Sequence, residues 1–279
     1  MAKGGATVRI VPEGHTIHRL AADLKKDLIH EPVTAISPQG RFADGAALID
    51  GGLLKNSEAW GKHLFCSWTN GCILHIHLGL IGKFRRFDLS QVPTDTVRLR
   101  LETTKNAWQL TGPQTCAIIE KYERDELVSQ LGPDPLRLGK RGKKTFVPRL
   151  RSVSKPLGAA LLDQKLIAGI GNVYRSEILF LAGIRPDVLG IELTQAQAES
   201  IWDISVLQLR KGREWNRIVT VTSDDIGRRV TKKTAKGKTL YAYKRGGMPC
   251  RRCHTFIEQS TSAGRSIWYC PSCQEGNYA

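Results

Sequence analysis

The sequence predicts an α+β protein of several domains, with a strand-rich N-terminal half, a helical half and a small cysteine-containing module at the C-terminus. Three observations support this fold class. Apolar and polar residues alternate along parts of residues 32–122, apolar residues recur at helical spacing after residue 155, and four of the seven cysteines form two closely spaced pairs. With 279 residues, the chain is long enough for one large or two ordinary domains with apolar cores.

The first predicted helix follows the opening of the stretch VPEGHTIHRL, residues 11–20. Apolar residues recur there at helical spacing: Ile17, Leu20, Ala21, Leu24 and Leu28. Pro12 and Glu13 therefore stand at the start of an amphipathic helix, where the local pattern alone favours a structural role for a proline and an acidic side chain. His15 and His18 lie one turn apart, but no carboxylate or cysteine partner is evident nearby, so we predict no metal site there.

Residues 32–122 carry the strand signals. In VRLRLE, residues 97–102, apolar residues alternate with charged ones. Asn70-Gly71 lies between the apolar runs HLFCSW and CILHIHL, and this dipeptide is typical of a two-residue hairpin turn. This half is therefore predicted to be an antiparallel β-sandwich or barrel.

The helical half contains three predicted helices. LGAALLDQ and NVYRSEILFLAG are separated by a glycine-containing turn, and Asn172 is the candidate N-cap of the second. A later helix begins at Thr194, which precedes Gln197 with the spacing of a capping box. Its apolar positions are Ala198, Ile201, Ile204 and Leu207.

Two cysteine pairs give the most specific local signal. Sixteen residues separate the pair Cys250 and Cys253 from the pair Cys270 and Cys273, and such pairs can present four thiolates tetrahedrally to zinc. The residues between the pairs suit a β-hairpin with its turn near 263–264. The other three cysteines are interpreted as small buried apolar residues, and an odd total in a reducing compartment argues against a disulfide framework. They are Cys66, Cys72 and Cys116.

The formal net charge of +16 exceeds what solubility requires and predicts a polyanionic partner, with nucleic acid favoured over a membrane surface. Residues 133–155 are predicted to be a basic linker, because eight Lys or Arg lie between Arg137 and Lys155 with no acidic residue. Ten more lie from Arg228 to Arg252, again without an acidic residue, as phosphate neutralisation requires. No apolar run approaches the roughly 20 residues of a membrane span, and no signal-peptide core is present. We therefore expect a cytoplasmic, nucleoid-associated protein.

Four segments resemble the formamidopyrimidine-DNA glycosylase and endonuclease VIII family of base-excision repair enzymes. They are PEGHTIHRL near the start, WGKHLF at 60–65, LDQKLIAGIGNVYRSEILF at 162–180 and GRSIWYCPSCQ at 264–274. The PEGH opening is most similar to the endonuclease VIII-like branch found in actinobacteria. The resemblance implies a monomer with an N-terminal helix and catalytic β-sandwich over 12–132, a helix-two-turn-helix DNA-binding domain over 156–240 and a zinc finger over 241–279.

The same resemblance implies a bifunctional DNA glycosylase and apurinic/apyrimidinic (AP) lyase. It would remove oxidised bases, with pyrimidines favoured, and cleave the strand by β,δ-elimination. Mature enzymes of this family begin at the proline, so Pro12 would attack the anomeric carbon of the damaged nucleotide as a secondary amine. A terminal amine titrates near ~8, which leaves a useful fraction uncharged at neutral pH. Glu13 would act as general acid and base.

Four other residues receive roles from the resemblance. Lys62 would contact a phosphate beside the lesion from an inter-strand loop, and Arg265 would hold two backbone phosphates, both as part of the catalytic group. Asn172 would bind a phosphate at a helix N-terminus, and Leu80 would fill the space left by a flipped base. Each of three residues also has a plainer structural alternative: Lys62 as a solvated lysine, Asn172 as an N-cap and Leu80 as a strand-end leucine.

Pro12 is internal in this sequence, and its nitrogen is then a tertiary amide that cannot act as a nucleophile. We therefore expect residues 1–11 to be a non-native or misannotated extension. Translation would begin at Val11, from a GTG codon read as methionine that is then removed. The alternative is a non-catalytic, zinc-containing protein that binds damaged DNA with a blocked nucleophile.

Overall fold

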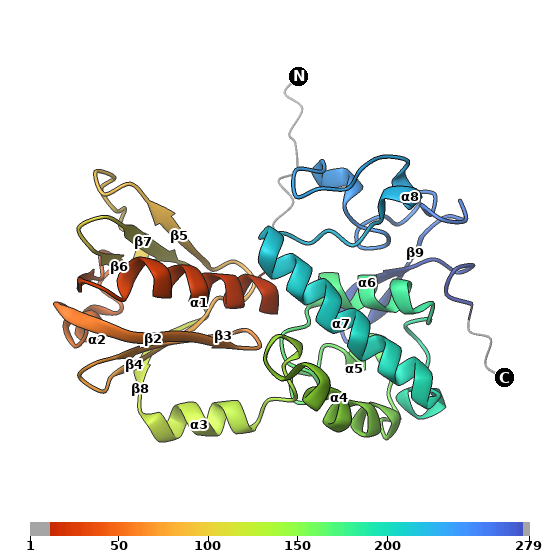
Figure 1. The fold of residues 1–279 in the computed structure, drawn as a ribbon, viewed down its shortest axis with the longest axis horizontal. Coiled ribbons are helices and arrows are strands. Elements are labelled where there is room, and N and C mark those ends of the chain that lie inside the picture. Colours follow the sequence, from red (N-terminus) through yellow and green to blue (C-terminus); the bar gives the residue numbers. More distant parts are fainter. Residues whose placement is uncertain (1–11, 276–279) are drawn as a thin grey trace. The chain divides into compact units, whose positions relative to one another are not determined.

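The structure, a computed structural model, describes residues 12–275, and the predicted extension 1–11 lies outside the described residues. The described chain divides into two compact units. The β-rich unit contains residues 12–13 and 20–125, and the helical unit contains residues 14–19 and 126–275. The predicted α+β class is confirmed (Figure 1).

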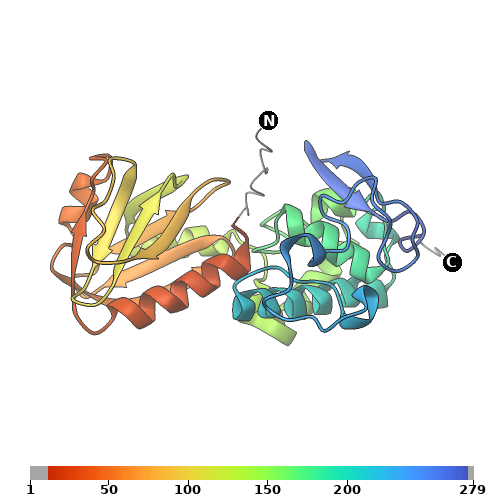
Figure 2. The same ribbon diagram turned by 90° about the horizontal axis from the view of Figure 1, so that it is seen from above.

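Helix α1 (Gly14–Leu28) forms where the sequence predicts it. Leu24 and Leu28 on its apolar face are almost completely buried. Its second half runs along the sheet of the β-rich unit (Figures 1 and 2), where Trp108 Nε1 donates to Asp27 Oδ2 over 3.1 Å. The apolar stripe of this helix is thus explained by burial against the sheet.

Eight strands form one sheet in the order β5-β7-β6-β1-β2-β3-β4-β8, and neighbouring strands are antiparallel, as predicted. The strands are β1 (Pro32–Ile36), β2 (Gly52–Trp60), β3 (His63–Trp68), β4 (Ile73–His77), β5 (Lys83–Phe87), β6 (Val97–Glu102), β7 (Ala107–Thr111) and β8 (Thr115–Ile119). Helix α2 (Ala43–Ala47) lies between β1 and β2, and α3 (Lys121–Ser129) follows β8. The central strand β1 pairs with both β2 and β6.

The Asn-Gly hairpin between β3 and β4 has a longer turn than predicted. The loop contains Thr69, Asn70 and Gly71, because Trp68 N donates to Cys72 O over 2.9 Å. Within this loop only Gly71 has a positive φ, of 92°. A two-residue type I′ turn needs positive φ at both of its central residues, so a three-residue loop with one left-handed glycine forms instead.

Strand β6 departs from strict alternation at Arg100, which the pattern predicts on the polar face. Its side chain is only 3% exposed. The guanidinium donates to the carbonyl oxygens of Gln91 and Leu89 and pairs with Glu102. These acceptors offset the cost of burying the charge.

The helical unit continues with short and long helices and one hairpin. The elements are α4 (Pro135–Arg151), α5 (Leu157–Ala160), α6 (Asn172–Ala182), η1 (Gly190–Glu192), α7 (Gln195–Trp215), α8 (Ser223–Ile226), η2 (Lys236–Lys238), β9 (Glu258–Ser262) and β10 (Arg265–Tyr269). Its helical core includes Phe146, Leu150, Ile178 and Trp202. No helix within residues 12–275 combines the length and apolarity needed to cross a membrane.

The prediction of a basic linker over residues 133–155 is wrong, because most of this segment is helix α4. The Asp134 side chain caps the helix by accepting from Leu136 N over 2.8 Å. A kink at Gly139, with φ of 47°, bends the helix. Three apolar residues at helical spacing are buried: Phe146, Val147 and Leu150. The basic residues that suggested a linker are interspersed among these core positions.

Two details of the later helices differ from the predictions. Gly171, in an extended conformation, is the N-cap of α6, so Asn172 is its first helical residue rather than its cap. Helix α7 begins with the predicted capping box of Thr194 and Gln197. Leu207, placed on its apolar face by the sequence, is 62% exposed. The buried face of α7 instead continues through Leu209, which is 1% exposed.

Strands β9 and β10 form the predicted C-terminal hairpin (Figure 2). Ala263 and Gly264 both have positive φ, of 52° and 68°. This is the left-handed pair that a two-residue type I′ turn requires.

Candidate active site and metal centre

Pro12 and Glu13 lie directly before the first residue of α1. Glu13 is the N-cap, with φ of −122° and ψ of 177°, but its side chain makes no capping hydrogen bond. That side chain is also fully buried. A carboxylate placed only to favour the helix dipole could remain in water, whereas the Glu13 side chain lies inside the protein. The purely structural interpretation therefore explains Glu13 poorly.

Lys62 lies in the tight turn between β2 and β3, as the sequence predicts. Gly61 before it has φ of 55°. Burial lowers the pKa of His63 to about 3, and the charges of His77, His75 and Lys62 act in the same direction. Burial also lowers the pKa of His75 to about 4. The imidazoles beside the lysine are therefore neutral at physiological pH.

These imidazoles form a cluster across two neighbouring strands. His75 and His77 share a face of β4, and His63 on β3 joins them through a 2.9 Å hydrogen bond between its Nδ1 and His75 Nε2. Phe65 stacks on His75 with ring centroids 5.0 Å apart. Sequence reasoning missed His63 because the register of β3 against β4 brings it there.

Leu80 lies in the turn between β4 and β5 and is 58% exposed. The sequence did not single out its neighbour Ile81, which is 60% exposed. A Cβ on Gly112 would lie 3.7 Å from Ile81 Cγ1, so this side chain rests beside the β7–β8 connection. Two exposed apolar side chains in one turn form a tip suited to contact with an apolar surface.

Asn172 belongs to the first turn of α6, and its side chain bridges to the hairpin. Its Nδ2 donates to Ser266 O over 3.1 Å. Its Oδ1 is buried and has no hydrogen-bond partner within the described residues. The oxygen can only accept, so it is the second N–H of Nδ2 that can donate to an anion at this helix N-terminus, where the dipole favours one.

Arg175, one turn further along α6, was not predicted. Its side chain is fully buried. The guanidinium donates to four carbonyl oxygens, those of Gly158, Ser262, Arg265 and Ser266. Three of these acceptors belong to the hairpin, so Arg175 fixes the backbone that carries the exposed side chain of Arg265.

Glu177 provides a second buried anchor on α6. Its carboxylate accepts from the backbone N–H groups of Tyr241, Ala242 and Tyr243, each over 2.8 Å. It also accepts from the hydroxyl of Thr220. This carboxylate therefore secures the chain that leads into the cysteine module.

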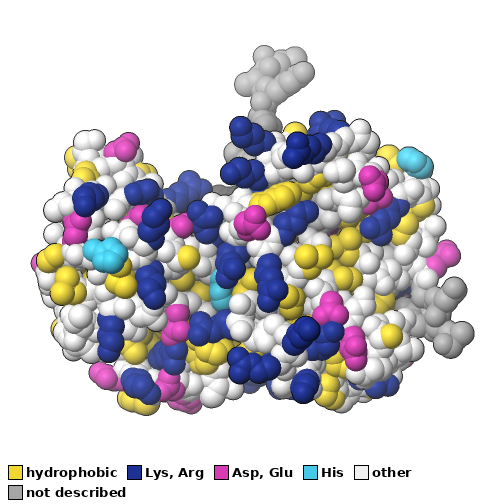
Figure 3. Space-filling view, viewed as in Figure 1, with side chains coloured by type: hydrophobic (Ala, Val, Ile, Leu, Met, Phe, Trp, Pro, Cys, Tyr) yellow, Lys and Arg dark blue, Asp and Glu magenta, His cyan; other side chains and the backbone are white. Residues whose placement is uncertain are grey.

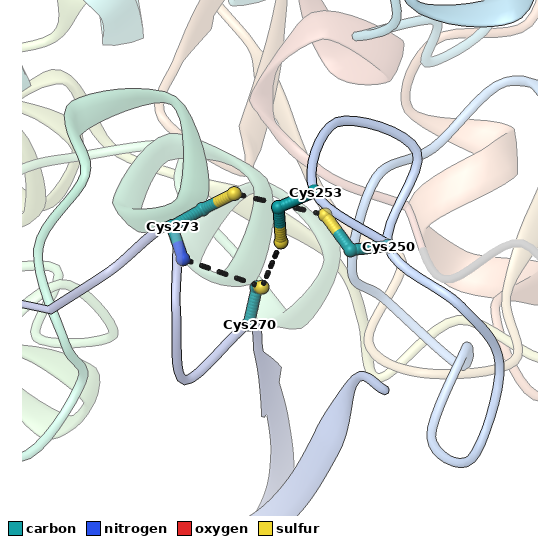
Figure 4. A group of neighbouring side chains, drawn as sticks. All are labelled: Cys250, Cys253, Cys270 and Cys273. Atoms are coloured by element: carbon teal, nitrogen blue, oxygen red, sulfur yellow. Dashed lines mark hydrogen bonds between the residues drawn. The ribbon is translucent and has the colours of Figure 1, made fainter. Parts of the chain in front are cut away.

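The four C-terminal cysteines converge, as predicted (Figure 4). All four Sγ atoms lie within 4.8 Å of one another. Cys250 Sγ is 3.8 Å from Cys273 Sγ, and Cys253 Sγ is 3.4 Å from Cys270 Sγ. Thiolates around tetrahedral zinc lie about 3.8 Å apart for Zn–S bonds of about 2.3 Å. The arrangement is therefore suited to a metal ion.

Two of the cysteines outside the cluster, Cys66 and Cys116, carry no sign of reactivity. Burial raises the pKa of Cys66 to about 11 and that of Cys116 to about 12. Such thiols remain protonated and unreactive at neutral pH.

The basic segment from Arg228 to Arg252 is less available to a polyanion than its charge suggests. Arg245 is 8% exposed and donates to the carbonyl oxygens of Tyr241 and Pro249. Arg252 lies over the Tyr241 ring at 4.9 Å. These two side chains brace the segment itself. Lys and Arg nevertheless outnumber acidic side chains on the face shown in Figure 3.

Comparison with known proteins identifies the family. Residues 11–118 match the formamidopyrimidine-DNA glycosylase N-terminal domain, and residues 131–223 match the formamidopyrimidine-DNA glycosylase H2TH domain. Endonuclease 8 1 of Mycobacterium tuberculosis is 36% identical over 269 residues, which cover 95% of this chain and 100% of the relative. The chain belongs to the formamidopyrimidine-DNA glycosylase family. The predicted resemblance, including its endonuclease VIII-like branch, is confirmed.

Two further members of the formamidopyrimidine-DNA glycosylase family are also similar to this chain over most of its length. The DNA-(apurinic or apyrimidinic site) lyase Nei2 of Mycolicibacterium smegmatis is 29% identical over 271 residues, covering 95% of this chain and 99% of the relative. The Lactococcus lactis glycosylase, solved in complex with DNA containing an abasic site, has a TM-score of 0.77. It is 23% identical, with 95% of this chain and 100% of that chain covered. The fold is therefore that of this glycosylase family.

Proposed function

We propose that this protein is a bifunctional DNA glycosylase and AP lyase of base-excision repair, acting on oxidised bases with pyrimidines favoured. The observation that carries the proposal is the Pro12-Glu13 pair at the head of α1 in a chain of this family. The fully buried Glu13 carboxylate is the feature that a purely structural helix start does not require.

Pro12 must have a free secondary amine to react, and the family match supports a start near it. The matched N-terminal domain begins at residue 11, which supports Val11 as the initiator position. We propose that the mature chain begins at Pro12 after removal of the initiating methionine. Mass spectrometry of the native protein tests this, and an intact species that retains residues 1–11 would contradict it.

The proposed reaction begins with covalent capture of the sugar and ends with strand cleavage. The Pro12 nitrogen bonds to C1′ and releases its proton, and the glycosidic electron pair leaves with the base, which takes up a proton. Glu13 protonates the sugar ring oxygen as the ring opens to an iminium ion. The iminium accepts electrons when a C2′ proton is removed and the 3′ phosphate leaves, and a second elimination expels the 5′ phosphate. Hydrolysis of the iminium ion frees the amine.

The remaining predicted residues are proposed to bind DNA. The Lys62 ammonium and the Arg265 guanidinium would neutralise phosphates next to the lesion, and both would belong to the catalytic group. Asn172 would add an amide hydrogen bond at the N-terminus of α6. Leu80, at an exposed apolar tip, would occupy the space that the flipped nucleotide leaves in the base stack.

A structural zinc ion is proposed at the cysteine cluster, with Cys250, Cys253, Cys270 and Cys273 as its four thiolate ligands. Four thiolates complete a tetrahedral shell and leave no open position for substrate, so the ion would stabilise the module without entering the reaction. Its contribution would be to keep the hairpin that carries Arg265 folded.

Borohydride trapping on abasic DNA tests the enzymatic proposal. A chain produced to begin at Pro12 should become covalently joined to the DNA, and oligonucleotides with single oxidised pyrimidines should be cleaved faster than those with oxidised purines. The full 279-residue chain, with its acylated proline, serves as the control. If the shortened chain binds abasic DNA without crosslinking, the non-catalytic DNA-binding alternative holds instead.

A further inference from the structure

The first turn of α1 contains Gly14, His15 and His18, which have no role in the chemistry above. Residues 14–19 nevertheless belong to the helical unit, apart from the rest of α1. We propose that this turn is an anchor that fixes the position of the preceding Pro12, with Gly14 as its main positioning residue. The proposal rests on the proposed function, because it concerns where the nucleophile is held.

Gly14 makes a close backbone contact. Its N–H donates to Gly169 O over 2.8 Å. A Cβ at residue 14 would lie 2.8 Å from Gly169 Cα and 3.0 Å from its carbonyl oxygen. These are backbone atoms, which cannot rotate aside as a flexible side chain can. In a helix, alanine is normally favoured over glycine by about 0.5–1 kcal/mol, so this contact, rather than helix formation, explains the glycine.

The acceptor loop is itself held on both sides of Gly169. Gln164 Oε1 accepts from Gly169 N over 3.0 Å. Gln164 Nε2 donates to the carbonyl oxygens of Ile170 and Leu162 over 3.0 and 2.9 Å. One side chain thus fixes the backbone immediately before and after the carbonyl that receives the Gly14 hydrogen bond.

His15 fills a closed site between α6 and α7. Its ring meets the Tyr174 ring edge-on with centroids 5.2 Å apart. A Cβ on Gly212 would lie 3.1 Å from the His15 ring. The side chain is only 2% exposed, and burial lowers its pKa to about 3. It is therefore a neutral packing group that prevents the turn from rotating.

His18 supplies the third contact. Its Nε2 donates to Asp134 Oδ2 over 2.8 Å, and Asp134 also caps α4. The turn is thus fixed to three parts of the helical unit, namely the Gly169 loop, the α6–α7 pair and the start of α4. These contacts give both histidines of the pair a role in fixing the turn.

The position of Pro12 follows from this anchor through two peptide units. Each trans peptide spans about 3.8 Å between Cα atoms, so a shift at Gly14 is passed on to the proline nitrogen. A displacement of about 1 Å at a reacting group can reduce a rate by about 100-fold. The anchor should therefore affect the rate of covalent capture much more than the affinity for DNA.

Gly14→Ala tests the inference in a chain beginning at Pro12. The matched control is Gly237→Ala, because a Cβ on Gly237 would meet no atom within 4 Å. We expect Gly14→Ala to lower the single-turnover rate of borohydride trapping on abasic DNA by about 10-fold to 100-fold. The dissociation constant for DNA with an unreactive tetrahydrofuran site should change by less than about twofold, and the control should leave both quantities unchanged.

A second pair keeps the test informative if Gly14→Ala does not fold. Glutamine at residue 18 can still donate to Asp134, whereas leucine cannot. His18→Leu should slow trapping, and His18→Gln should restore most of the rate. The anchor is refuted if folded Gly14→Ala traps at the control rate, or if the two residue-18 variants trap equally fast. Failure of the unsubstituted chain to trap would instead overturn the proposed function, and this inference with it.

Discussion

At the scale of single residues, exposure separates two uses of arginine. Arg100, Arg175 and Arg245 are each less than a tenth exposed and donate to backbone carbonyl oxygens. Arg265 is exposed and directs only its backbone carbonyl to Arg175. The net charge of +16 therefore overstates the cations available for a polyanion. Phosphate binding depends on the exposed subset, since buried guanidinium groups are already hydrogen-bonded.

The buried histidines predict a dependence of stability on pH. Burial lowers the pKa of His63 to about 3 and that of His75 to about 4, below the value of about 6.5 for an unfolded chain. The unfolded chain then binds more protons, so stability is full above about pH 6.5 and is lost as the pH falls toward 4. Each histidine contributes a slope of at most about 1.4 kcal/mol per pH unit.

Denaturant unfolding between pH 4 and 8 measures this slope. His75→Phe should flatten the acid limb, because phenylalanine can keep the stacking with Phe65 and has no proton to bind. Asparagine in place of the exposed His30 serves as the control and should leave the profile unchanged. An unaltered acid limb in the His75 variant would contradict this account.

At the scale of elements, α6 organises the C-terminal module. Asn172 and Arg175 bond to the hairpin, and Glu177 bonds to residues 241–243. All three side chains project from two consecutive turns of one helix. Because the hairpin is only two strands wide, it needs such support to be stable. Helix α6 therefore links the helical core to the cysteine module.

Glu177→Ala should be strongly destabilising. It would leave three backbone N–H groups without their acceptor, which costs at least about 3 kcal/mol when each loss costs about 1–3 kcal/mol. Glu177→Gln is the matched variant, because its amide oxygen can still accept from part of the set. Chemical denaturation measures the free energy of unfolding of both variants. The glutamine variant should lose about half as much stability as the alanine variant. Equal effects of the two substitutions would mean that the carboxylate is not an anchor.

At the scale of the whole molecule, two apolar clusters lie in the helical unit. One contains Phe146 and Trp202. The other contains Phe180, Tyr241 and two of the four clustered cysteines, Cys250 and Cys270. A metal at the cysteines would therefore stabilise mainly the second cluster. The β-rich unit and the first cluster have their own buried residues and should not depend on it.

Removal of the proposed zinc by a chelator tests this division. Hydrogen exchange should accelerate across residues 241–275, while the sheet strands keep their protection. Cys273→Ser should reproduce the effect and lower the metal content. Cys72→Ser, at a cysteine outside the cluster, should do neither. If exchange in the sheet accelerates as strongly as in the hairpin, the two regions are coupled and the division is wrong.

The sequence by itself determined the features that depend on neighbouring residues along the chain. These include α1, the capping box at Thr194, the hairpin turn at 263–264, the paired cysteines and the family motifs, because turn chemistry, periodicity and ligand spacing are local. It also placed Lys62 in a loop between two strands. The linker over 133–155 was mispredicted because charge masked a helical apolar pattern.

Only the tertiary structure decided which polar groups are internal and what they hold. The acceptors of Arg175 come from two distant segments, the partners of Glu177 lie more than forty residues away, and Gly14 is needed because Gly169 approaches it. No local pattern encodes these contacts. A buried charge or a missing side chain is tolerated only where the folded backbone supplies matching acceptors, donors or atoms at close range.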